Sequence, residues 1–269
     1  MGNSPSARIK DAAKKEKTKL SFRHEGLKKL PPSINTVTSL EELALDQNEL
    51  KTLPVTIGDL KNLQRINLFS NKLKELPQEI TGCESLIELN LSVNKLTALP
   101  RGMGAFNNMT VLDISTNQIT EITRQIGYIR SLRELYASQN KIRDIPPELG
   151  ELTKLERLVL NHNEIAHIPM ELGQCASLEM ADFSHNKINL IPPDLGRLPR
   201  IKMIKLANNP LDPDLRDVIA KRNDKWVALQ EFVLSPEYDK KYFEYQRAEQ
   251  NDESFDDISG DDVGMYGDD

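Results

Sequence analysis

The stretch LERLVLNHNEIAHIP, residues 155–169, places one asparagine, Asn163, among leucines and isoleucines whose spacing fits neither a strand nor a helix. Counting from Asn163 in steps of 23 residues, in both directions, meets an asparagine at every step across most of the chain. The positions are Asn48, Asn71, Asn94, Asn117, Asn140, Asn163, Asn186 and Asn209. A fixed period of this length is the signature of a repeat architecture, so it takes precedence over local propensity.

The apolar positions keep the same period, and the consensus of the repeats is LxxLxLxxNxLxxLPxxIGxLxxL. We expect the LxL segment to form a short strand, the Asn to turn the chain, and the IGxLxxL segment to cover the convex side. Because one repeat cannot bury its leucines alone, the repeats should stack about 4.8 Å apart in a parallel sheet. The Asn amide should bond backbone groups that the turn leaves unpaired. The sequence therefore predicts an α/β solenoid with a parallel sheet on its concave face.

The period also divides the chain into four segments. They are a basic leader at 1–19, the repeats at 20–211, a helical C-terminal cap at 212–246 and an acidic, disordered tail at 247–269. The first copy, from Leu20, has Glu25 where the asparagine belongs, which indicates an N-terminal cap repeat. Thr123 stands where the consensus has proline, and we expect a looser convex turn there. Past Asn209 the apolar residues follow a helical spacing, as expected of a cap that shields the last repeat.

Two features of the C-terminal region bear on function. Tyr238, Tyr242 and Tyr245 fall on one helix face, which we expect to pack on the cap, although a partner could also be offered this face. In the tail, Ser254 and Ser259 each begin an S-x-D-D pattern that suits an acid-directed kinase, which makes both candidate phosphorylation sites.

The N-terminus begins MGNSPS, which fits the pattern for N-myristoylation with Gly2 as the acceptor. One myristoyl chain binds a membrane only marginally, so a second signal is needed. The leader supplies a basic cluster that an anionic membrane surface would attract. The cluster consists of Arg8, Lys10, Lys14, Lys15, Lys17 and Lys19. Membrane tethering through Gly2 is the hypothesis, and a basic leader without a lipid is the alternative.

The motifs NKLKELPQEI, residues 71–80, and NKIRDIPPELGELTKL, residues 140–155, resemble the repeats of intracellular leucine-rich-repeat proteins of the Ras group, which include Ras suppressor protein and its relatives. The resemblance covers residues 20 to about 211. It implies a right-handed leucine-rich-repeat solenoid and a non-catalytic scaffold or adaptor in signal transduction, with a small GTPase or its effector as partner. A related type of repeat protein binds enzymes through the concave face. The alternative is therefore a soluble regulatory or targeting subunit of an enzyme such as a protein phosphatase.

Residues between the apolar positions of each strand point away from the core and should line the concave face, where a protein partner binds. The candidate binding residues are Glu42, Asp46, Arg65, Phe69, Glu88, Asn90, Asp113, Glu134, Tyr136, Arg157, Val159, His162, Asp182, His185 and Lys205. Phe69 and Tyr136 are the expected aromatic anchors of the interface.

Several other kinds of site are disfavoured by the sequence. His162 and His185 should be neighbours, but no third or fourth ligand accompanies them, so we expect no metal site and no cofactor. Cys83 and Cys175 lie four repeats apart, too far for a disulfide, and should be buried spacer thiols. No catalytic motif is found, so we expect that the chain is not an enzyme.

Composition bears on where the chain resides and disfavours one class of partner. The net charge of −6 and the mildly acidic repeats disfavour nucleic acid. No apolar run approaches the length of a membrane span, and the N-terminus lacks a secretory signal. We therefore expect a cytoplasmic monomer, at the cytoplasmic face of a membrane if Gly2 is lipidated.

Overall fold

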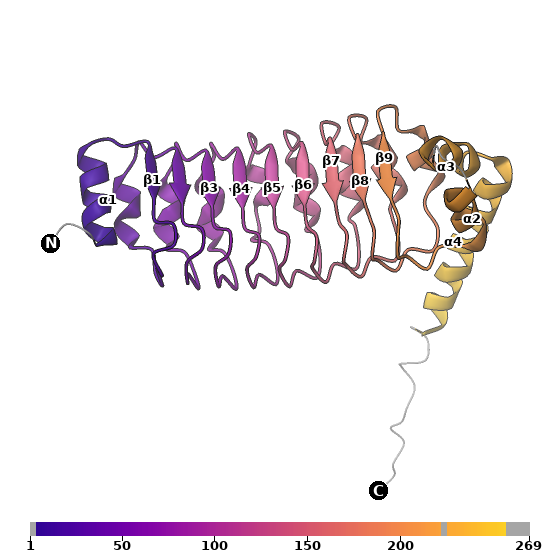
Figure 1. Cartoon of the computed structure of the whole chain (residues 1–269), viewed down its shortest axis with the longest axis horizontal. Coiled ribbons are helices and arrows are strands. Elements are labelled where there is room, and N and C mark those ends of the chain that lie inside the picture. Colours follow the sequence, from indigo (N-terminus) through magenta and orange to yellow (C-terminus); the bar gives the residue numbers. More distant parts are fainter. Residues whose placement is uncertain (1–3, 222–224, 257–269) are drawn as a thin grey trace, which may run out of the picture.

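The computed structural model describes residues 4–221 and 225–256, which form one elongated solenoid (Figure 1). Its strands make a single sheet in which spatial order follows sequence order. The strands are β1 Lys19–Ser21, β2 Glu42–Ala44, β3 Arg65–Asn67, β4 Glu88–Asn90, β5 Val111–Asp113, β6 Glu134–Tyr136, β7 Arg157–Val159, β8 Met180–Asp182 and β9 Met203–Lys205. The α-helices are α1 Pro5–Lys14, α2 Pro213–Lys221, α3 Lys225–Val233 and α4 Pro236–Asp256.

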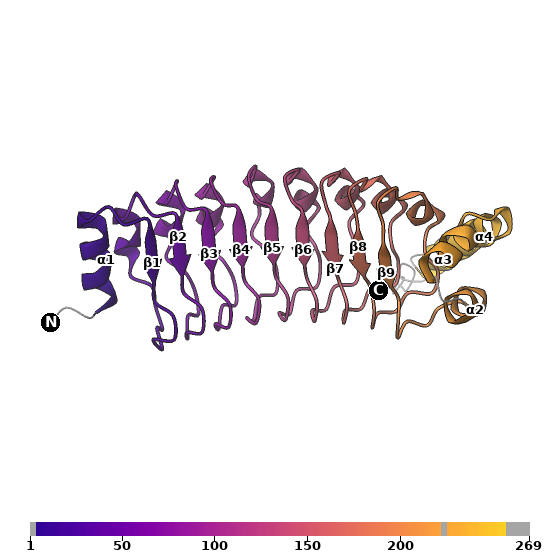
Figure 2. The same cartoon turned by 45° about the horizontal axis from the view of Figure 1, so that its top comes forward.

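Short 3-10 helices return the chain on the convex side, one between each pair of successive strands. They are η1 Pro32–Thr36, η2 Val55–Asp59, η3 Gln78–Gly82, η4 Met103–Ala105, η5 Arg124–Tyr128, η6 Pro147–Glu151, η7 Met170–Gln174 and η8 Pro193–Arg197. Figure 2 shows these helices forming the layer behind the sheet. The consensus glycine serves the packing of this layer, because a Cβ on Gly58 would lie 2.1 Å from the carbonyl oxygen of Glu79 in the next repeat.

The register of the sheet equals the sequence period. Every strand pairs with the next in parallel, so that Leu43 lies opposite Ile66 and Leu135 opposite Leu158. All four of these side chains are buried in one core that runs the length of the solenoid. The predicted solenoid, with its parallel sheet and helical C-terminal cap, is confirmed.

The asparagine of each repeat ties its own turn to the repeat before it. Asn163 accepts a hydrogen bond at Oδ1 from the backbone N–H of Ile142, 3.1 Å away. Its Nδ2 donates to the carbonyl oxygens of Ala137 and Leu160, each at 2.9 Å. The same kinds of bond recur at Asn48, Asn71, Asn94, Asn117, Asn140, Asn186 and Asn209. The asparagine therefore serves the fold, as the sequence predicted, because it satisfies backbone groups inside the coil.

The N-terminal segment forms a helix, α1, that packs on the first repeat. The sequence predicts a basic leader at 1–19 apart from the solenoid, whereas α1 packs against η1 and completely buries Ile9 and Ala12. Ser4 caps the helix by accepting a hydrogen bond from the N–H of Ala7. The reason lies in spacing, because Ile9, Ala12 and Ala13 stand at i, i+3 and i+4 and form an apolar stripe on one face.

Arg8 of α1 fastens this helix to the first strand. Its Nη1 lies 2.5 Å from Oε1 of Glu25, and its Nη2 donates to the backbone carbonyl of Ser21 in β1. The guanidinium also sits over the ring of Phe22, 4.4 Å from the ring centroid. Because no strand precedes β1 in the part of the chain that the structure describes, the Ser21 carbonyl lies on an open edge of the sheet, and Arg8 satisfies it.

The tyrosine stripe belongs to the C-terminal cap. Tyr238 is 1% exposed, and its hydroxyl donates to the carbonyl oxygen of Ile191 at 2.8 Å while accepting from the N–H of the same residue at 3.1 Å. Tyr242 is buried beside it, and Tyr245 packs against the core at partial exposure. The prediction that this face packs on the cap is confirmed.

Helix α4 continues beyond the boundary placed at 246. It runs to Asp256, so residues 247–256, expected to be disordered, are helical. The segment holds helix formers such as Ala248 and Gln250, and the first glycine comes only at Gly260. Neither α4 nor any other helix in 4–221 and 225–256 is long and apolar enough to cross a membrane.

The expected loosening at Thr123 is not observed. Helix η5, which Thr123 precedes, has the same length as most of its counterparts, because the Thr123 side chain caps it by accepting from the N–H of Gln125. The shortened convex turn is η4, which follows Gly102 with a φ of 83°. A threonine hydroxyl thus replaces the fixed φ of proline as the start signal of the turn.

Candidate protein-binding site

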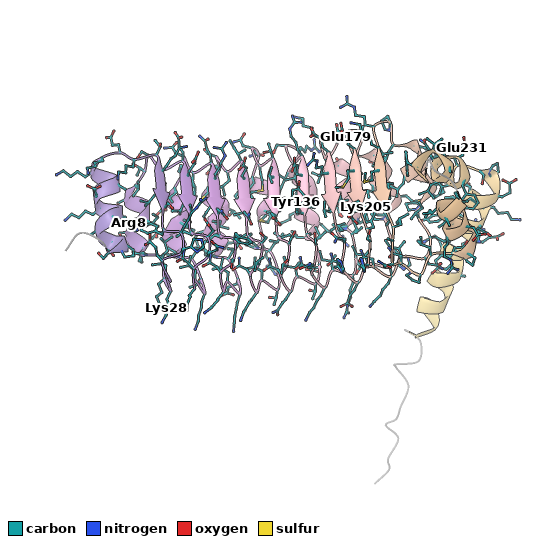
Figure 3. The ribbon with its side chains drawn as sticks, viewed as in Figure 1. Arg8, Lys28, Tyr136, Glu179, Lys205 and Glu231 are labelled. Atoms are coloured by element: carbon teal, nitrogen blue, oxygen red, sulfur yellow. The ribbon has the colours of Figure 1, made fainter. Side chains whose placement is uncertain are left out.

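The concave face presents two rows of side chains along the sheet. In each strand the middle residue is directed into the core, and the first and third residues point to the open side. Figure 3 shows Tyr136 near the middle of this face and Lys205 toward its C-terminal end. Any partner on the concave face therefore contacts the first and third residues of the strands.

The first row begins as a ladder of ion pairs. Glu42 Oε1 lies 3.0 Å from Lys19 Nζ and 3.0 Å from Arg65 Nη1. Arg65 Nε lies 3.3 Å from Glu88 Oε2 on the next strand. Hydrogen bonds and charge from Lys19, and then from Arg65, hold the pKa of Glu42 below its ordinary value. These cations are already matched by carboxylates, so the N-terminal part of the row offers little net charge.

The ladder breaks at β5, where Val111 takes the place of a charged residue. Glu88, Asp113 and Glu134 stand on three successive strands around Val111, and we call these three residues the acidic segment. Asp113 Oδ1 accepts a hydrogen bond from the N–H of Ser115 at 2.9 Å. Among the described residues Asp113 has no ion-pair partner, so the acidic segment carries an excess of negative charge beside an apolar side chain.

A hollow of about 340 Å³ spans this part of the sheet, and we call it the concave hollow. It is lined by Arg23, Glu42, Leu43, Ala44, Arg65, Ile66, Asn67, Glu88, Leu89, Asn90, Val111, Asp113 and Tyr136. Its walls combine carboxylates, amides, an aromatic ring and a short apolar floor. This composition suits a protein side chain that has both a polar head and an apolar body.

Tyr136 is the aromatic residue of the hollow. Its ring is half-buried, and its hydroxyl donates a hydrogen bond to a carboxylate oxygen of Glu134. Burial, followed by the bond to Glu134, raises the pKa of the Tyr136 hydroxyl, while Arg157 opposes the rise. Phe69, the second predicted anchor, is half-buried outside the hollow. A rigid ring held in place by a hydrogen bond is the kind of side chain that forms an interface anchor.

The structure gathers six of the predicted binding residues and leaves nine outside the hollow. The six are Glu42, Arg65, Glu88, Asn90, Asp113 and Tyr136. The nine are Asp46, Phe69, Glu134, Arg157, Val159, His162, Asp182, His185 and Lys205. Two carboxylates among the nine are buried and internally paired, because Asp46 lies 2.8 Å from Arg23 Nε and Asp182 lies 3.2 Å from Lys205 Nζ.

His162 and His185 form a stacked pair toward the C-terminal end. Their ring centroids are 3.9 Å apart with an interplanar angle of 13°. Both residues take the left-handed conformation that every repeat adopts just before its asparagine. His185 Nε2 lies 2.8 Å from the side-chain nitrogen of Asn208. Within the described part of the chain, no group of three or more His, Cys, Asp or Glu side chains is arranged to hold a metal ion.

Residues that the sequence analysis left out of its binding set also line the hollow. Arg23 contributes from the cap repeat, and Asn67 and Val111 contribute from β3 and β5. A usable signal was present for Arg23, because it stands one period before Asp46. Val111 was recognisable as an apolar residue between Glu88 and Glu134 in the row of charges that runs from Lys19 to Arg157, but only once the rows were aligned in register.

The cysteines fit the prediction of buried spacer thiols. Cys83 donates from Sγ to the carbonyl oxygen of Ile57 at 3.1 Å, and Cys175 to that of Leu149 at 3.2 Å. Burial raises the pKa of each thiol to about 12. Neither sulfur is therefore a nucleophile near neutral pH in the folded chain.

The predicted modification sites cannot be placed in the same way. Gly2 and Ser259 lie outside the described residues. Ser254 falls in α4, on the part of the helix past residue 246. Modification of these three residues stays a prediction.

Comparison with known proteins identifies the repeats. Family models match three stretches: a leucine-rich repeat region at 32–137, two copies of leucine-rich repeats at 130–169 and a leucine-rich repeat at 153–211. A comparison with curated proteins found no match.

Solved structures with the same repeat architecture come from plants and from a bacterium. The ectodomain of the membrane receptor kinase GASSHO1/SCHENGEN3 from Arabidopsis thaliana, in complex with Casparian strip integrity factor 2, is 28% identical with a TM-score of 0.64, over 71% of this chain and 24% of that chain. The plant peptide hormone receptor RGFR1, in complex with RGF2, is 30% identical with a TM-score of 0.56, over 68% of this chain and 34% of that chain. Internalin C2 from Listeria monocytogenes is 25% identical with a TM-score of 0.64, over 71% of this chain and 80% of that chain.

This chain thus covers only about a quarter to a third of the two plant receptor chains. The repeats, however, are matched without a break from residue 32 to residue 211, a range that includes β2 to β9. Together with the parallel sheet and its 23-residue register, these matches show that the chain belongs to the leucine-rich-repeat proteins.

Proposed function

We propose that the chain is a non-catalytic adaptor that binds a partner protein through the concave hollow. The observation that carries the proposal is the local excess of carboxylates. Val111 stands between Glu88 and Glu134 where the ladder would need a cation, and Asp113 has no ion-pair partner among the described residues. Leucine-rich-repeat solenoids generally act as protein-interaction scaffolds. Two similar receptor chains were solved in complexes, one with Casparian strip integrity factor 2 and the other with RGF2.

The chemistry of the hollow describes the part of the partner that fits. A Lys or Arg side chain of the partner would face Glu88 and Asp113, and an adjacent apolar residue would contact Val111 and the ring of Tyr136. The charge supplies orientation and association rate, and the apolar contact supplies most of the affinity. By resemblance to the Ras-group repeats, a small GTPase or its effector is the first partner class, and a protein phosphatase is the alternative.

A capture experiment tests the hollow. The protein is purified with its native partners beside an Asp113→Lys variant, which places a cation among the carboxylates, and a Glu75→Lys variant, which makes the same charge change at an exposed site outside the hollow. We expect Asp113→Lys to lose the partner and Glu75→Lys to retain it. Retention by both variants would contradict the proposal. Nucleotide-dependent capture indicates a GTPase, and co-purified phosphatase activity indicates the alternative.

We also propose that myristate on Gly2 holds the adaptor at the cytoplasmic face of a membrane. Helix α1 limits how much the basic cluster adds to binding. Four of its members are already paired: Arg8 with Glu25, Lys15 and Lys17 with Asp11, and Lys19 with Glu42. Tethering therefore depends mainly on the lipid, and the exposed Lys10 and Lys14 add electrostatic attraction of about 1 kcal/mol each at most.

Membrane fractionation with intact mass tests this part separately. We expect the wild type to gain one myristoyl mass and to sediment with membranes, and Gly2→Ala to remain unmodified and soluble. A Lys10→Gln/Lys14→Gln variant should keep the lipid and bind more weakly, and its binding should fall less steeply with salt. If wild type and Gly2→Ala behave alike and carry no lipid, the soluble regulatory subunit becomes the better hypothesis.

A further inference from the structure

A groove follows the free edge of β9, at the opposite end of the sheet from α1. It has a volume of about 670 Å³ and lies between β9 and helix α2, with Trp226 of α3 at its wall. Side chains from both faces of β9 line it, including Met203 and Lys205 from the concave side and Ile204 from the core side. Because both faces contribute, the groove runs along the strand edge. Figure 2 shows α2 and α3 beyond β9 at this end.

The backbone of this edge is ready to pair with another strand. In the preceding repeats the corresponding N–H groups bond to the next strand, as Leu160 does to the carbonyl of Asp182 at 2.8 Å and Phe183 to that of Lys205 at 2.9 Å. The equivalent N–H groups after β9 belong to Leu206 and Asn208. None of the described residues accepts a hydrogen bond from either, since no strand lies beyond β9 in 4–221 and 225–256. Free donors along an edge are a template for strand addition.

The side chains of the edge are also incompletely covered. Ile204 is partly exposed, whereas its counterparts Leu158 and Ala181 in the two preceding repeats are fully buried. Met203 is 48% exposed. Helix α3 packs on η8 at the convex side, so the cap shields the back of the last repeat and leaves β9 open. In the earlier repeats, the next repeat covers the corresponding apolar side chains. An added strand would cover them at β9.

The charge of the groove favours an acidic occupant. Among the described residues, its lining includes Lys202, Lys205 and Arg216 and no carboxylate. Lys202 and Lys205 already meet Glu179 and Asp182 of the neighbouring repeat, at 2.7 and 3.2 Å, so the net attraction comes chiefly from Arg216. Figure 3 shows Lys205 and Glu179 at this end of the sheet.

We propose that the occupant is the chain's own C-terminal segment, residues 257–269, added to β9 as a tenth strand. The segment reads DISGDDVGMYGDD, which combines five aspartates with no basic residue. Val263, Met265 and Tyr266 supply the apolar side chains that Ile204 and Trp226 lack as neighbours. Because the segment is tethered, it occupies the groove ahead of a similar peptide on another molecule.

The segment is long enough to reach the groove. Lys241 of α4 bonds Asp212 and Asp214 at the start of α2, next to Leu211, which lines the groove. From Lys241 to Asp256 the helix rises about 22 Å, at 1.5 Å per residue. Thirteen extended residues span about 43 Å. About six residues at 3.6 Å each cover that distance, so the chain can return to the groove and leave roughly seven residues, 263–269, to pair with the edge.

Amide hydrogen exchange on the full chain tests the pairing directly. The comparison variant is the full chain with Val263→Ser, Met265→Ser and Tyr266→Ser, which removes the apolar side chains of the part that should pair and leaves Ile258 in place. We expect the N–H groups of Leu206 and Asn208 to exchange on the order of tenfold more slowly in the wild type than in the variant. Equal exchange rates would overturn the proposal. Protection that grows with protein concentration would also overturn it, because the occupant would then belong to a second copy.

A peptide experiment separates strand pairing from simple charge attraction. A synthetic peptide of residues 257–269 is titrated into the serine variant, with emission from Trp226, the single tryptophan, as the readout. We expect the peptide to shift the emission to shorter wavelength. Two further peptides are N-methylated, one at Val263 and Met265 and the other at Gly264 and Tyr266.

Alternate N–H groups of a strand face opposite sides, so only one of the two methylated peptides should lose binding, by on the order of tenfold. Equal binding of both methylated peptides would overturn the strand addition, since it would leave only an acidic segment attracted to Arg216. An Arg216→Gln variant should weaken all the peptides alike.

Discussion

The sheet has a strand edge at each end of the solenoid, and within the described residues only the edge at β1 is covered by a helix. At the N-terminal end, Arg8 of α1 donates to the Ser21 carbonyl and α1 buries Ile9 against the first repeat. At the C-terminal end the cap helices cover the convex side, and β9 keeps a groove along its edge. A repeat exposes its edge wherever the array stops, so the flanking sequence decides whether the edge is closed or offered for binding.

The largest expected effect comes from opening the closed end. Replacing Ile9 by alanine removes a fully buried side chain between α1 and the first repeat. We expect the free energy of unfolding to fall by about 3 kcal/mol, from lost burial and the remaining cavity. Urea unfolding followed by far-UV circular dichroism measures it, and Lys10→Ala on the exposed face of α1 is the matched control. A loss no larger than that of the control would mean that α1 does not close the edge.

The asparagines allow an internal repeat to be compared with the open end. Asn117→Ala leaves the N–H of Leu96 and the carbonyls of Leu91 and Ile114 without their partner inside the coil, which should cost about 2 to 3 kcal/mol. Asn209→Ala should cost about 1 kcal/mol, because its hydrogen bonds to Ile188, Phe183 and Leu206 are only partly buried. Denaturant unfolding of both variants gives the difference, and equal losses would indicate that the last repeat is as closed as an internal one.

A smaller effect is expected from Arg8 itself. Arg8→Met keeps the contact with Phe22 and removes the hydrogen bonds to Glu25 and to the Ser21 carbonyl. Because the paired side chains are about a third exposed, solvent screening limits the loss to about 1 kcal/mol. Thermal unfolding should show the difference, and it should shrink for Arg8→Lys, which retains one donor. No change for Arg8→Met would assign the closure to apolar packing alone.

The thiols report on the two halves without altering stability near neutral pH. With pKa values raised to about 12 by burial, Cys83 and Cys175 should not react with a thiol reagent at pH 8 in the folded chain. We expect the C-terminal end to unfold locally at lower urea concentration than the rest, so Cys175 should react at a lower urea concentration than Cys83. The variants Cys83→Ser and Cys175→Ser each leave one thiol, so the reaction of each can be followed separately. Simultaneous reaction would show that the repeats unfold as one unit.

The same raised pKa values predict a pH effect with a definite sign. Folding keeps both thiols protonated, whereas an unfolded cysteine ionises near pH 8.5. Their contribution to stability is therefore complete below about pH 8.5 and declines as the pH rises from there toward 12. Replacing each cysteine by alanine should flatten the fall in stability over that range.

The array was readable from sequence because each of its constraints repeats. Asn163 and its equivalents mark the turn at a fixed period, and every inward leucine recurs with them, so a chance match at one position is corrected by the others. Helix α1 occurs once, and its signal is no more than Ile9, Ala12 and Ala13 on one face beside a cap serine. A segment that short also fits a basic leader, and only its contacts with the first repeat distinguish the two.

The sequence was sufficient to predict which residues lie on the concave face, but not which of them remain available to a partner. Strand alternation assigned the outward residues correctly, including Glu88, Asp113 and Tyr136. It could not show that Asp46 and Asp182 are buried and paired with Arg23 and Lys205, because those contacts depend on side-chain conformation across neighbouring strands. The groove at β9 was not predictable either, since it arises from how the cap helices pack.

The most direct measurement is residue-resolved amide exchange at both sheet ends, in the full chain with Val263, Met265 and Tyr266 replaced by serine. The account predicts slow exchange at Phe22 and Leu45, whose N–H groups bond to Ala44 and Asn67, and much faster exchange at Leu206, whose N–H has no acceptor among the described residues. If Leu206 exchanged as slowly as Leu45, the C-terminal edge would be closed and the contrast between the ends would fail.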